Sequence, residues 1–489
     1  MLTKQPPIEI DFKNFTEGMT TSPDTQDGGF SSETYNISIM GDVGVLRSSN
    51  VLTTRLTSTS GYFNGNVIAT SGDARISAVG NDKVFITDTG RFYTYKSNVS
   101  TLRQTSGGSK TYTAATTDII QFRGDTFCTS QTDIARLIQS DLTQPNADWE
   151  SWWTVTQAKT ALVSVYRHPM VIFENSLWIA DGKFLHKWDG TTSTHGFLTL
   201  SDEQSIISLA VDPSTGKMLI GINESLNASN TVPAVSKVLL YNGFSNKPDR
   251  AIIVDDMVTA MYPLGGTVYM FYGQRMGYWT GTGIQFLRKL RGVTLDANYL
   301  IYKHKVTSIA NTLYVGEGTY VLAFGEVQPG KKMFYYPQRA SGAALGFFSA
   351  IGYVGNNQLG LFYDDNTNKN LVTFDVTYNT AANNGTNISP ITFRSLKYKF
   401  PRPIRLLGIY VEYADGVTNG TTPGTISIID DNLNSFSFGS LLNSSGATIY
   451  QQYLNKTDLN QKMRKFQLVY SADHAVGILR FLVEWEYAE

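Results

Sequence analysis

The chain of 489 residues carries 40 Lys and Arg against 41 Asp and Glu, and this balance argues against a protein that coats nucleic acid through general positive charge. Its single cysteine, Cys128, excludes an internal disulfide framework and a cysteine-based zinc site, and its apolar neighbours predict a small buried side chain. Aromatic residues at 12% and 43 glycines favour strands and turns over helices. Without a signal-peptide pattern or an apolar run of membrane-spanning length, we expect a soluble protein made in the cytoplasm.

The first 60 residues fit no repeat and predict an extended arm followed by a hairpin. Pro6 and Pro7 oppose helix, and the alternation of apolar and polar residues in 8–12 predicts a strand. A polar loop follows, and the segments 35–39 and 43–47 flank a Gly-Asp turn. We therefore expect residues 1–60 to form a region of their own.

Seven copies of one pattern follow between Gly80 and Asp375: a short polar turn, an aromatic-rich strand, a second turn and another aromatic-rich strand. The clearest copies begin at Asn175 (NSLWIADGKFLHKWD), Gly266 (GTVYMFYGQRMGYWT) and Asn311 (NTLYVGEGTYVLAF). Weaker copies begin at Asn81, Gly124, Gly216 and Asn357. Steps of 41 to 51 residues are typical of propeller blades. Because one blade cannot cover both its faces, residues 61–390 are expected to form a closed β-propeller of about seven blades.

The rhythm changes after a polar, turn-rich linker at 378–388. Long segments of alternating apolar and polar residues follow, at 392–400, 405–413, 425–430, 465–470 and 478–487. Such strands predict an antiparallel β-sandwich. The expected fold class is therefore all-β: an N-terminal arm and hairpin (1–60), a β-propeller (61–390) and a C-terminal antiparallel β-sandwich (391–489).

Both ends of the chain resemble one family. The segment 13–19 (KNFTEGM) with 44–47 (GVLR) resembles the start of virion tail proteins of short-tailed bacteriophages. The segments 463–471 (MRKFQLVYS) and 479–487 (LRFLVEWEY) are similar to the last sandwich of their tail hub and nozzle proteins. With the propeller between them, the resemblance covers essentially the whole chain. It implies a hexameric ring below the portal and adaptor, which retains the packaged genome and later ejects it; no catalytic residues are known for such rings.

Propellers also host enzymes, but the sequence lacks the motifs that would indicate one. The sialidase box Ser-x-Asp-x-Gly-x-x-Trp has no clean copy, because Asp181 and Gly182 are adjacent in the nearest match. Trp188-Asp189 stands alone among the repeats, whereas Trp-Asp propellers need this pair in blade after blade. No GxSxG, HExxH or Walker A motif occurs. We therefore expect a protein that is not an enzyme, with no catalytic residues, no cofactor and no metal.

Two polar features partly resemble metal sites. The five histidines show no metal-type spacing, and His186, which lies in a strand, is expected to be packed or on the surface. The run Asp364–Asp375 has oxygen-bearing side chains at positions one, three, five and twelve of a calcium loop, but Lys369 stands where such a loop needs glycine. A polar hairpin turn is the favoured interpretation, and a cation site is the alternative.

Two segments are candidate interfaces. In the arm, the apolar residues that would complete the sheet edge of a neighbouring subunit are Ile8, Ile10, Phe12 and Phe15. Near the start of the sandwich, a basic cluster without an acid within it comprises Arg394, Lys397, Lys399, Arg402 and Arg405. A solvated sandwich face is the default interpretation of the basic cluster. The functional interpretation is a patch for an acidic neighbour or for DNA phosphates, and salt would weaken either contact.

Three hypotheses of function follow. The first is a structural virion protein, a subunit of a ring-shaped phage tail hub or nozzle, hexameric by the resemblance. Its partners would be the portal or adaptor, other tail proteins and genome DNA that passes without sequence-specific binding. The second is a receptor- or glycan-binding tail protein or a propeller glycosidase. Its sugar platforms would be Trp153, Trp178, Trp188 and Trp279, although packing between blades explains these residues more simply. The third, a cellular interaction propeller, is disfavoured because the blades lack the expected repeat motifs.

Overall fold

The structure is a computed structural model. It describes residues 8–13, 15, 18–19, 30–35, 37–38, 47–48, 52–57, 75–79, 82–86, 92–96, 99–104, 118–129, 132–137, 149–163, 167–225, 233–291, 300–328, 331–339, 347–355, 357–364, 369–376, 391–414, 424–441, 449–455, 462–472 and 477–488. Within these ranges the fold is nearly all β, as the composition predicts, and the helical segments are two short turns, η1 (Trp152–Thr156) and η2 (Lys303–Lys305). No helix there has the length and apolar character to cross a membrane.

The chain forms two compact units. Unit 1 comprises Met1–Leu52, Val321–Arg339 and Phe374–Glu489, and unit 2 comprises Thr53–Tyr320 and Ala340–Thr373. This division differs from the boundaries at 60 and 390 that the sequence suggests, because residues 53–57 and 321–339 fall on the other side. Each unit is described by itself below.

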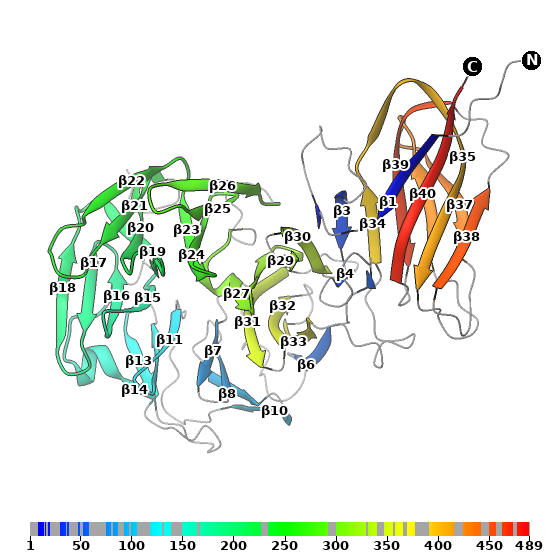
Figure 1. The fold of residues 1–489 in the computed structure, drawn as a ribbon. Helices are drawn as coiled ribbons and strands as arrows, with labels where there is room; N and C mark the ends of the chain where they lie inside the picture. The colour runs from blue at the N-terminus through cyan, green and yellow to red at the C-terminus, as the bar shows by residue number, and fades with distance from the viewer. Residues whose placement is uncertain are drawn as a thin grey trace, which may run out of the picture. The chain divides into compact units, whose positions relative to one another are not determined.

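Unit 2 is a β-propeller (Figure 1). Among the described residues, six four-stranded antiparallel sheets form its blades. In chain order they are β7 (Arg75–Val79) to β10 (Val99–Gln104), with β8 (Asp82–Ile86) and β9 (Phe92–Lys96); β11 (Asp118–Phe122), β12 (Asp125–Thr129), β13 (Ile134–Leu137) and β14 (Trp149–Ser151); β15 (Met170–Phe173), β16 (Ser176–Asp181), β17 (Phe184–Trp188) and β18 (Ser193–Thr199); β19 (Gln204–Val211), β20 (Met218–Ser225), β21 (Pro233–Tyr241) and β22 (Arg250–Val254); β23 (Val258–Leu264), β24 (Thr267–Tyr272), β25 (Arg275–Trp279) and β26 (Ile284–Lys289); and β31 (Phe347–Gly355), β32 (Gln358–Asp364) and β33 (Lys369–Asp375) with β6 (Thr53–Thr57).

The first strands of the blades form a ring around the propeller axis. In order, contacts link β7, β11, β15, β19, β23, β27 (Val306–Ile309) and β31, and β31 contacts β7. The last blade takes its outermost strand from the other end of the unit, since β6 pairs antiparallel with β33. This pairing corrects the expectation that residues 53–57 belong to the arm. Closure by an N-terminal strand joins the two ends of a ring whose blades cannot cover their faces singly.

Within the described ranges six blades are separate four-stranded sheets, where the repeats predict about seven blades. The repeat at Asn311 accounts for the difference. Its strands β27 and β28 (Thr312–Glu317) pair antiparallel and β27 takes its place in the ring, but they do not belong to a separate four-stranded sheet.

Aromatic and aliphatic side chains of the repeats fill the space between blades. Between the blades that begin with β15 and β19, Trp178 is fully buried and lies edge-on to Tyr241, with ring centroids 5.8 Å apart. Trp188 belongs to a neighbouring cluster, where its ring lies 4.7 Å from that of Trp152. Cys128 is buried in β12, which confirms the prediction of a small packed side chain. The aromatic signal in the sequence therefore reports the packing of blade against blade.

Unit 1 contains the C-terminal antiparallel β-sandwich. Its strands are β34 (Ile391–Ser395), β35 (Tyr398–Ala414), β36 (Thr425–Ile429), β37 (Ser435–Ser440), β38 (Ile449–Asn455), β39 (Met463–Ala472) and β40 (Gly477–Tyr487), joined by the N-terminal strands β1 (Ile8–Lys13), β2 (Gly18–Met19) and β3 (Phe30–Tyr35). The predicted hairpin appears as β4 (Ile37–Ser38) paired with β5 (Arg47–Ser48), and the unit also includes β30 (Lys331–Arg339) and most of β29 (Tyr320–Gln328). Aromatic contacts join its strands, such as that of Phe393 with Phe481 at 6.1 Å.

The N-terminal arm is part of this sandwich. β1 pairs antiparallel with β40, with Phe12 opposite Phe481. Phe12 is fully buried and lies edge-on to Tyr398, and Phe15 lies edge-on to Phe393. The arm was expected to have no fold of its own and to dock on a neighbour. Its aromatic residues instead pack inside the same chain, because β40 pairs with β1 and the rings of Tyr398 and Phe393 contact Phe12 and Phe15.

Candidate functional site at the propeller axis

The innermost strands bring three distant residues together at one end of the propeller axis. Asp118 is the first residue of β11, Met170 is the first residue of β15, and Lys303 lies in η2 just before β27. In the ring of contacts β11 and β15 are neighbours, whereas β27 lies on the opposite side (Figure 1). We call Asp118, Met170 and Lys303 the axial cluster.

The carboxylate oxygens of Asp118 accept three hydrogen bonds. Its Oδ1 accepts the backbone N–H of Ile119 at 2.8 Å, and its Oδ2 accepts the backbone N–H of Met170 at 2.8 Å. The Nζ of Lys303 donates to the same Oδ2 at 2.7 Å and to the carbonyl oxygen of Met170 at 2.8 Å. The side chain of Asp118 is 6% exposed and that of Lys303 is 34% exposed, so the ion pair is largely withdrawn from water.

Residues next to the axial cluster in the chain make further contacts at the same end of the axis. The guanidinium of Arg167 lies 3.7 Å from the ring centroid of Tyr302, and the Tyr302 ring stacks on that of His304. In the neighbouring blade, the hydroxyl of Thr129 donates to the carbonyl oxygen of His168 at 3.0 Å. These contacts tie the loops that precede β15 and β27 to their surroundings.

The arrangement at the axis suits a mechanical role. A buried carboxylate left alone would be costly, and here an ammonium group and two N–H donors neutralise it. Because these groups come from opposite sides of the ring, their hydrogen bonds hold opposite blades together. A carboxylate with this many partners has little capacity left to act as a base or a nucleophile.

A second polar centre lies within the blade that begins with β15. Asp181, at the end of β16, accepts the backbone N–H of Val163 at 2.9 Å. His168 Nδ1 lies 3.5 Å from one carboxylate oxygen of Asp181 and His186 Nε2 lies 3.8 Å from the other. Both histidines are fully buried. Because the backbone N–H of Gly196 donates to His186 Nδ1 at 2.9 Å, the proton of the neutral ring belongs on Nε2, facing Asp181.

Burial and the neighbouring charges shift both groups. Burial lowers the pKa of His186 below its usual 6.5, and nearby His195 and His168 lower it further, although Asp181 opposes the shift. Burial would raise the pKa of Asp181, but the nearby rings of His186 and His168 and the hydrogen bond from the backbone N–H of Val163 hold the pKa below its usual 3.8. His186 is thus a packed residue, one of the two outcomes that its place in a strand predicts.

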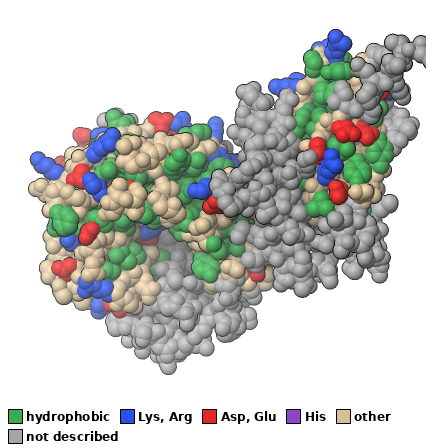
Figure 2. Space-filling model, viewed as in Figure 1, with side chains coloured by type: hydrophobic (Ala, Val, Ile, Leu, Met, Phe, Trp, Pro, Cys, Tyr) green, Lys and Arg blue, Asp and Glu red, His purple; other side chains and the backbone are tan. Residues whose placement is uncertain are grey.

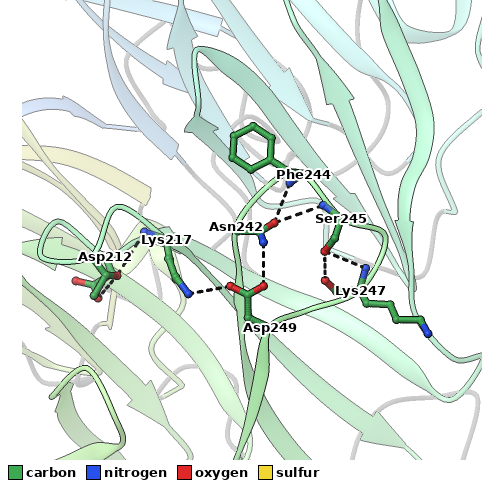
Figure 3. A network of polar contacts seen from close by, with 8 residues as sticks. Asp212, Lys217, Asn242, Phe244, Ser245, Lys247 and Asp249 are labelled. Atoms are coloured by element: carbon green, nitrogen blue, oxygen red, sulfur yellow. Dashed lines mark hydrogen bonds and ion pairs between the residues drawn. The ribbon is translucent and has the colours of Figure 1, made fainter.

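A third polar feature is the loop between β21 and β22, which holds an exposed aromatic side chain (Figure 3). The side-chain oxygen of Asn242 accepts the backbone N–H groups of Phe244 and Ser245, at 2.9 and 3.4 Å. Its amide donates to Asp249, which also pairs with Lys217 at 2.9 Å. The loop is therefore braced from within, while Phe244 is 78% exposed.

The structure divides the basic cluster that the sequence identifies. Arg405 pairs with Glu486 of the opposite strand β40, and Arg394 is partly buried within β34. Lys397, Lys399 and Arg402 are exposed. β39 adds two further exposed cations beside them, Arg464 and Lys465, which the sequence alone did not bring into the cluster. The one signal for them was the alternation of β39, which does not reveal its partner strand.

The remaining candidate residues lie in different surroundings. In the arm Ile10 is partly exposed, Phe12 and Phe15 are buried, and the side chain of Ile8 lies outside the described residues. The run Asp364–Asp375 links the neighbouring strands β32 and β33, and residues 365–368 between them are also outside the described part of the chain. The four tryptophans considered as sugar platforms are all buried: Trp153, Trp178, Trp188 and Trp279.

No family model matches the chain, and no curated protein matches it. Among solved structures it is similar to the computationally designed Ika8 protein, at 12% identity with a TM-score of 0.39 over 69% of this chain and 99% of that one. It is also similar to the Pan2 WD40 domain of Neurospora crassa, at 8% identity with a TM-score of 0.43 over 68% and 98%. A third is the Cps50 (Swd1) β-propeller domain of Myceliophteria thermophila, at 8% identity with a TM-score of 0.41 over 61% and 95%. Similarity at this level carries no argument about activity.

Proposed function

We propose that this protein is a structural, non-enzymatic subunit of a ring-shaped virion tail hub or nozzle of a short-tailed bacteriophage. In this role it would assemble with copies of itself, as a hexamer by the resemblance, and with the portal or adaptor. The ring would retain packaged DNA and form the conduit for its ejection. The order of arm, propeller and terminal sandwich supports the proposal, because it covers the whole chain.

The observation that carries the proposal is the axial cluster. Propeller enzymes hold their reacting groups around the axis, where loops of several blades converge. Here the described groups at that place, Asp118 and Lys303, neutralise each other and join opposite blades. The ion pair of Asp118 and Lys303 thus stabilises the closed propeller, and such a stabilised ring suits a subunit of a mechanical assembly.

Packing of the arm within its own sandwich moves the expected subunit contacts elsewhere. Phe12 and Phe15 are buried and have no surface to offer a neighbour. On the propeller, Phe244 and Ile253 belong to the blade that begins with β19 and are 78% and 73% exposed. Large apolar side chains held at the surface are typical anchors of protein interfaces, so we expect these two residues to contribute to the ring.

The test is the mass of the purified protein in solution, by light scattering at two salt concentrations. The proposal expects a closed ring of defined stoichiometry, or a monomer that forms one when portal and adaptor proteins are added. Phe244→Ser with Ile253→Ser should weaken the ring, whereas Val155→Ser, another exposed apolar position at 72%, should leave it intact. A chain that stays monomeric with those partners present contradicts the proposal.

The alternative of a glycan-binding or glycan-cleaving propeller has less support. Its expected platforms, the four buried tryptophans, present no surface to a sugar. A glycosidase also needs two carboxyl groups facing each other about 5–10 Å apart. Asp118 in the axial cluster faces an ammonium group instead. Cleavage of a capsular polysaccharide by the purified monomer would nevertheless favour this alternative over the ring.

A further inference from the structure

Five cations gather where β34 leads into β35 and β39 begins. We call this surface the basic corner, and its members are Lys397, Lys399, Arg402, Arg464 and Lys465. All five residues are exposed, and no ion pair holds any of them within the described part of the chain. Figure 2 shows Lys and Arg side chains at this end of unit 1, where the ribbon in Figure 1 arches between β34 and β35.

The strand register concentrates the charge. In the pairing of β35 with β39, Lys399 lies directly opposite Lys465. Side chains in such cross-strand pairs are about 5 Å apart at Cβ, and like charges in this position are destabilising. The nearest described acid by hydrogen bonding is Asp431, which accepts the backbone N–H of Arg464 at 3.0 Å and is itself exposed. An anion bound between Lys399 and Lys465 would relieve the repulsion between these two opposed lysines.

Two prolines place a further cation between them. The register of β35 against β39 shifts between Lys399 and Ile404, so the intervening residues leave the regular ladder. Pro401 and Pro403 have no N–H to donate and are suited to such an irregular stretch. Arg402 lies between them in the chain and is exposed, which adds a guanidinium to the irregular stretch that follows Lys399.

The layer beneath the basic corner is made of aromatic rings in contact with one another. Tyr398 stacks on Phe466 with centroids 5.6 Å apart, and Phe400 contacts Phe466 at 5.8 Å and Trp485 at 4.6 Å. Because these rings pack against one another, their faces are not open for stacking by unpaired bases. Any ligand would therefore contact the exposed cations and not the rings beneath them.

The composition of the basic corner favours a phosphate backbone over an acidic protein. Protein interfaces rely on a central group of apolar or aromatic anchors. Near this surface the described part of the chain has two large exposed apolar side chains: Tyr487, opposite Ile404 and 40% exposed, and Leu433, in the turn that holds Asp431 and 73% exposed. The five cations outnumber these two side chains, and a surface dominated by lysine and arginine matches the sequence-independent contacts that proteins make with DNA phosphates.

We propose that the basic corner binds the phosphate backbone of duplex DNA without reading its sequence. The choice of duplex DNA rests on the proposed function, in which packaged genome passes along the ring. The charge pattern itself rests on the described side chains alone. Binding and ring formation can therefore be measured separately on the same protein.

The experiment measures fluorescence anisotropy of a labelled random duplex of about 30 base pairs with the full chain, between about 50 and 200 mM salt. Each phosphate contact contributes a slope of about −0.9 to log K against log salt, so five contacts give about −4.5. Lys399→Glu with Lys465→Glu should weaken binding about tenfold or more at low salt and reduce the slope by about two. The matched control is Lys247→Glu with Lys289→Glu, two exposed lysines of unit 2, which should retain wild-type binding.

A second readout separates binding from folding. Lys399→Glu alone replaces the repulsive pair with an attractive one, so the melting temperature should rise slightly while DNA affinity falls. Absence of binding by the folded wild type at low salt overturns the inference, as does equal loss of binding in the control variant. Light scattering on the same samples reports the ring. A ring that does not bind DNA refutes this inference alone, and a DNA-binding monomer that never forms a ring refutes the proposed function alone.

Discussion

Lysines occupy opposite surroundings in the two units of this protein. At the propeller axis, Lys303 donates hydrogen bonds to the buried carboxylate of Asp118 and to the carbonyl oxygen of Met170. In the basic corner, Lys399 faces Lys465 with no acid between them. The first lysine has its counter-charge inside the fold, and the other two lack one within the described part of the chain.

The difference shows which interactions stabilise the fold at the propeller axis and which do so at the basic corner. At the axis, the hydrogen bonds of a largely buried ion pair link opposite blades, so removing one partner leaves a charge without compensation. At the corner, stacked rings hold the strands, and the exposed charges add nothing favourable to the fold. Charge is structural in the first region and free for a partner in the second.

The largest expected effect comes from breaking the aromatic layer of unit 1. Phe12→Ala removes a fully buried ring that packs edge-on against Tyr398 and should lower the free energy of unfolding by about 3–5 kcal/mol. Hydrogen-exchange mass spectrometry after partial unfolding in urea should locate the loss in β1, β35 and β40. The matched control, Phe286→Ala, removes a ring that is 54% exposed and should change stability by less than about 1 kcal/mol. Equal losses in the two variants would mean that the arm does not support the sandwich.

Breaking the axial ion pair should have the next largest effect. Lys303→Met leaves Asp118 without its cation and should destabilise unit 2 by about 2–3 kcal/mol, below the range for fully buried pairs because Lys303 is one-third exposed. Urea unfolding followed by tryptophan fluorescence measures it. Lys217→Met breaks the more exposed pair with Asp249 and should cost at most about 1 kcal/mol. Adding Asp118→Asn to Lys303→Met should restore part of the loss, and a further loss would contradict a charge-based lock.

Much of the fold could be predicted because repeats leave local traces. The spacing of aromatic strands gives the propeller, and alternation at 391–489 gives the sandwich strands. The N-terminal strands show what local pattern cannot give. β1 pairs with β40 and β6 pairs with β33, and both choices depend on which sheet edge is open after folding.

The sites were harder to predict for the same reason. Asp118 and Lys303 are 185 residues apart and belong to no motif, so their contact exists only once the ring closes. The basic cluster was visible as a run in the sequence, but the run included Arg405, whose partner Glu486 lies in another strand. The phage-tail role itself remains a prediction that the light-scattering test addresses.

A pH dependence would sharpen the contrast by adding a second buried charged site, the one that Asp181 forms with His168 and His186. Because burial lowers the pKa of His186 below 6.5, the unfolded chain takes up a proton before the folded chain does as the pH falls. Stability that is present above pH 6.5 should therefore decline below it, by at most about 1.4 kcal/mol per pH unit from this group. Asp181, with its pKa also lowered, should add a second decline below pH 3.8. His186→Asn, which keeps an acceptor for Gly196, should remove the first decline in urea unfolding at pH 7.5 and 5.5. An unchanged slope in that variant would assign the decline to other groups.

The smallest expected effect concerns a polar network that is neither buried nor free, the loop around Asn242 (Figure 3). Asn242→Ala removes the acceptor for Phe244 N–H and the donor to Asp249, and should cost about 0.5–1 kcal/mol because water replaces much of what is lost. Its clearer consequence is local: the loop should open more often, so in the monomer chymotrypsin should cut after Phe244 faster than in the wild type. Asn246→Ala, an exposed position in the same loop, should leave the cleavage rate unchanged. Equal cleavage of both variants would show that the side chain of Asn242 does not brace the loop. Faster cleavage of Asn242→Ala alone would place this network between the buried axial pair and the exposed basic corner. Its hydrogen bonds would then order a surface loop and add little to the stability of the propeller.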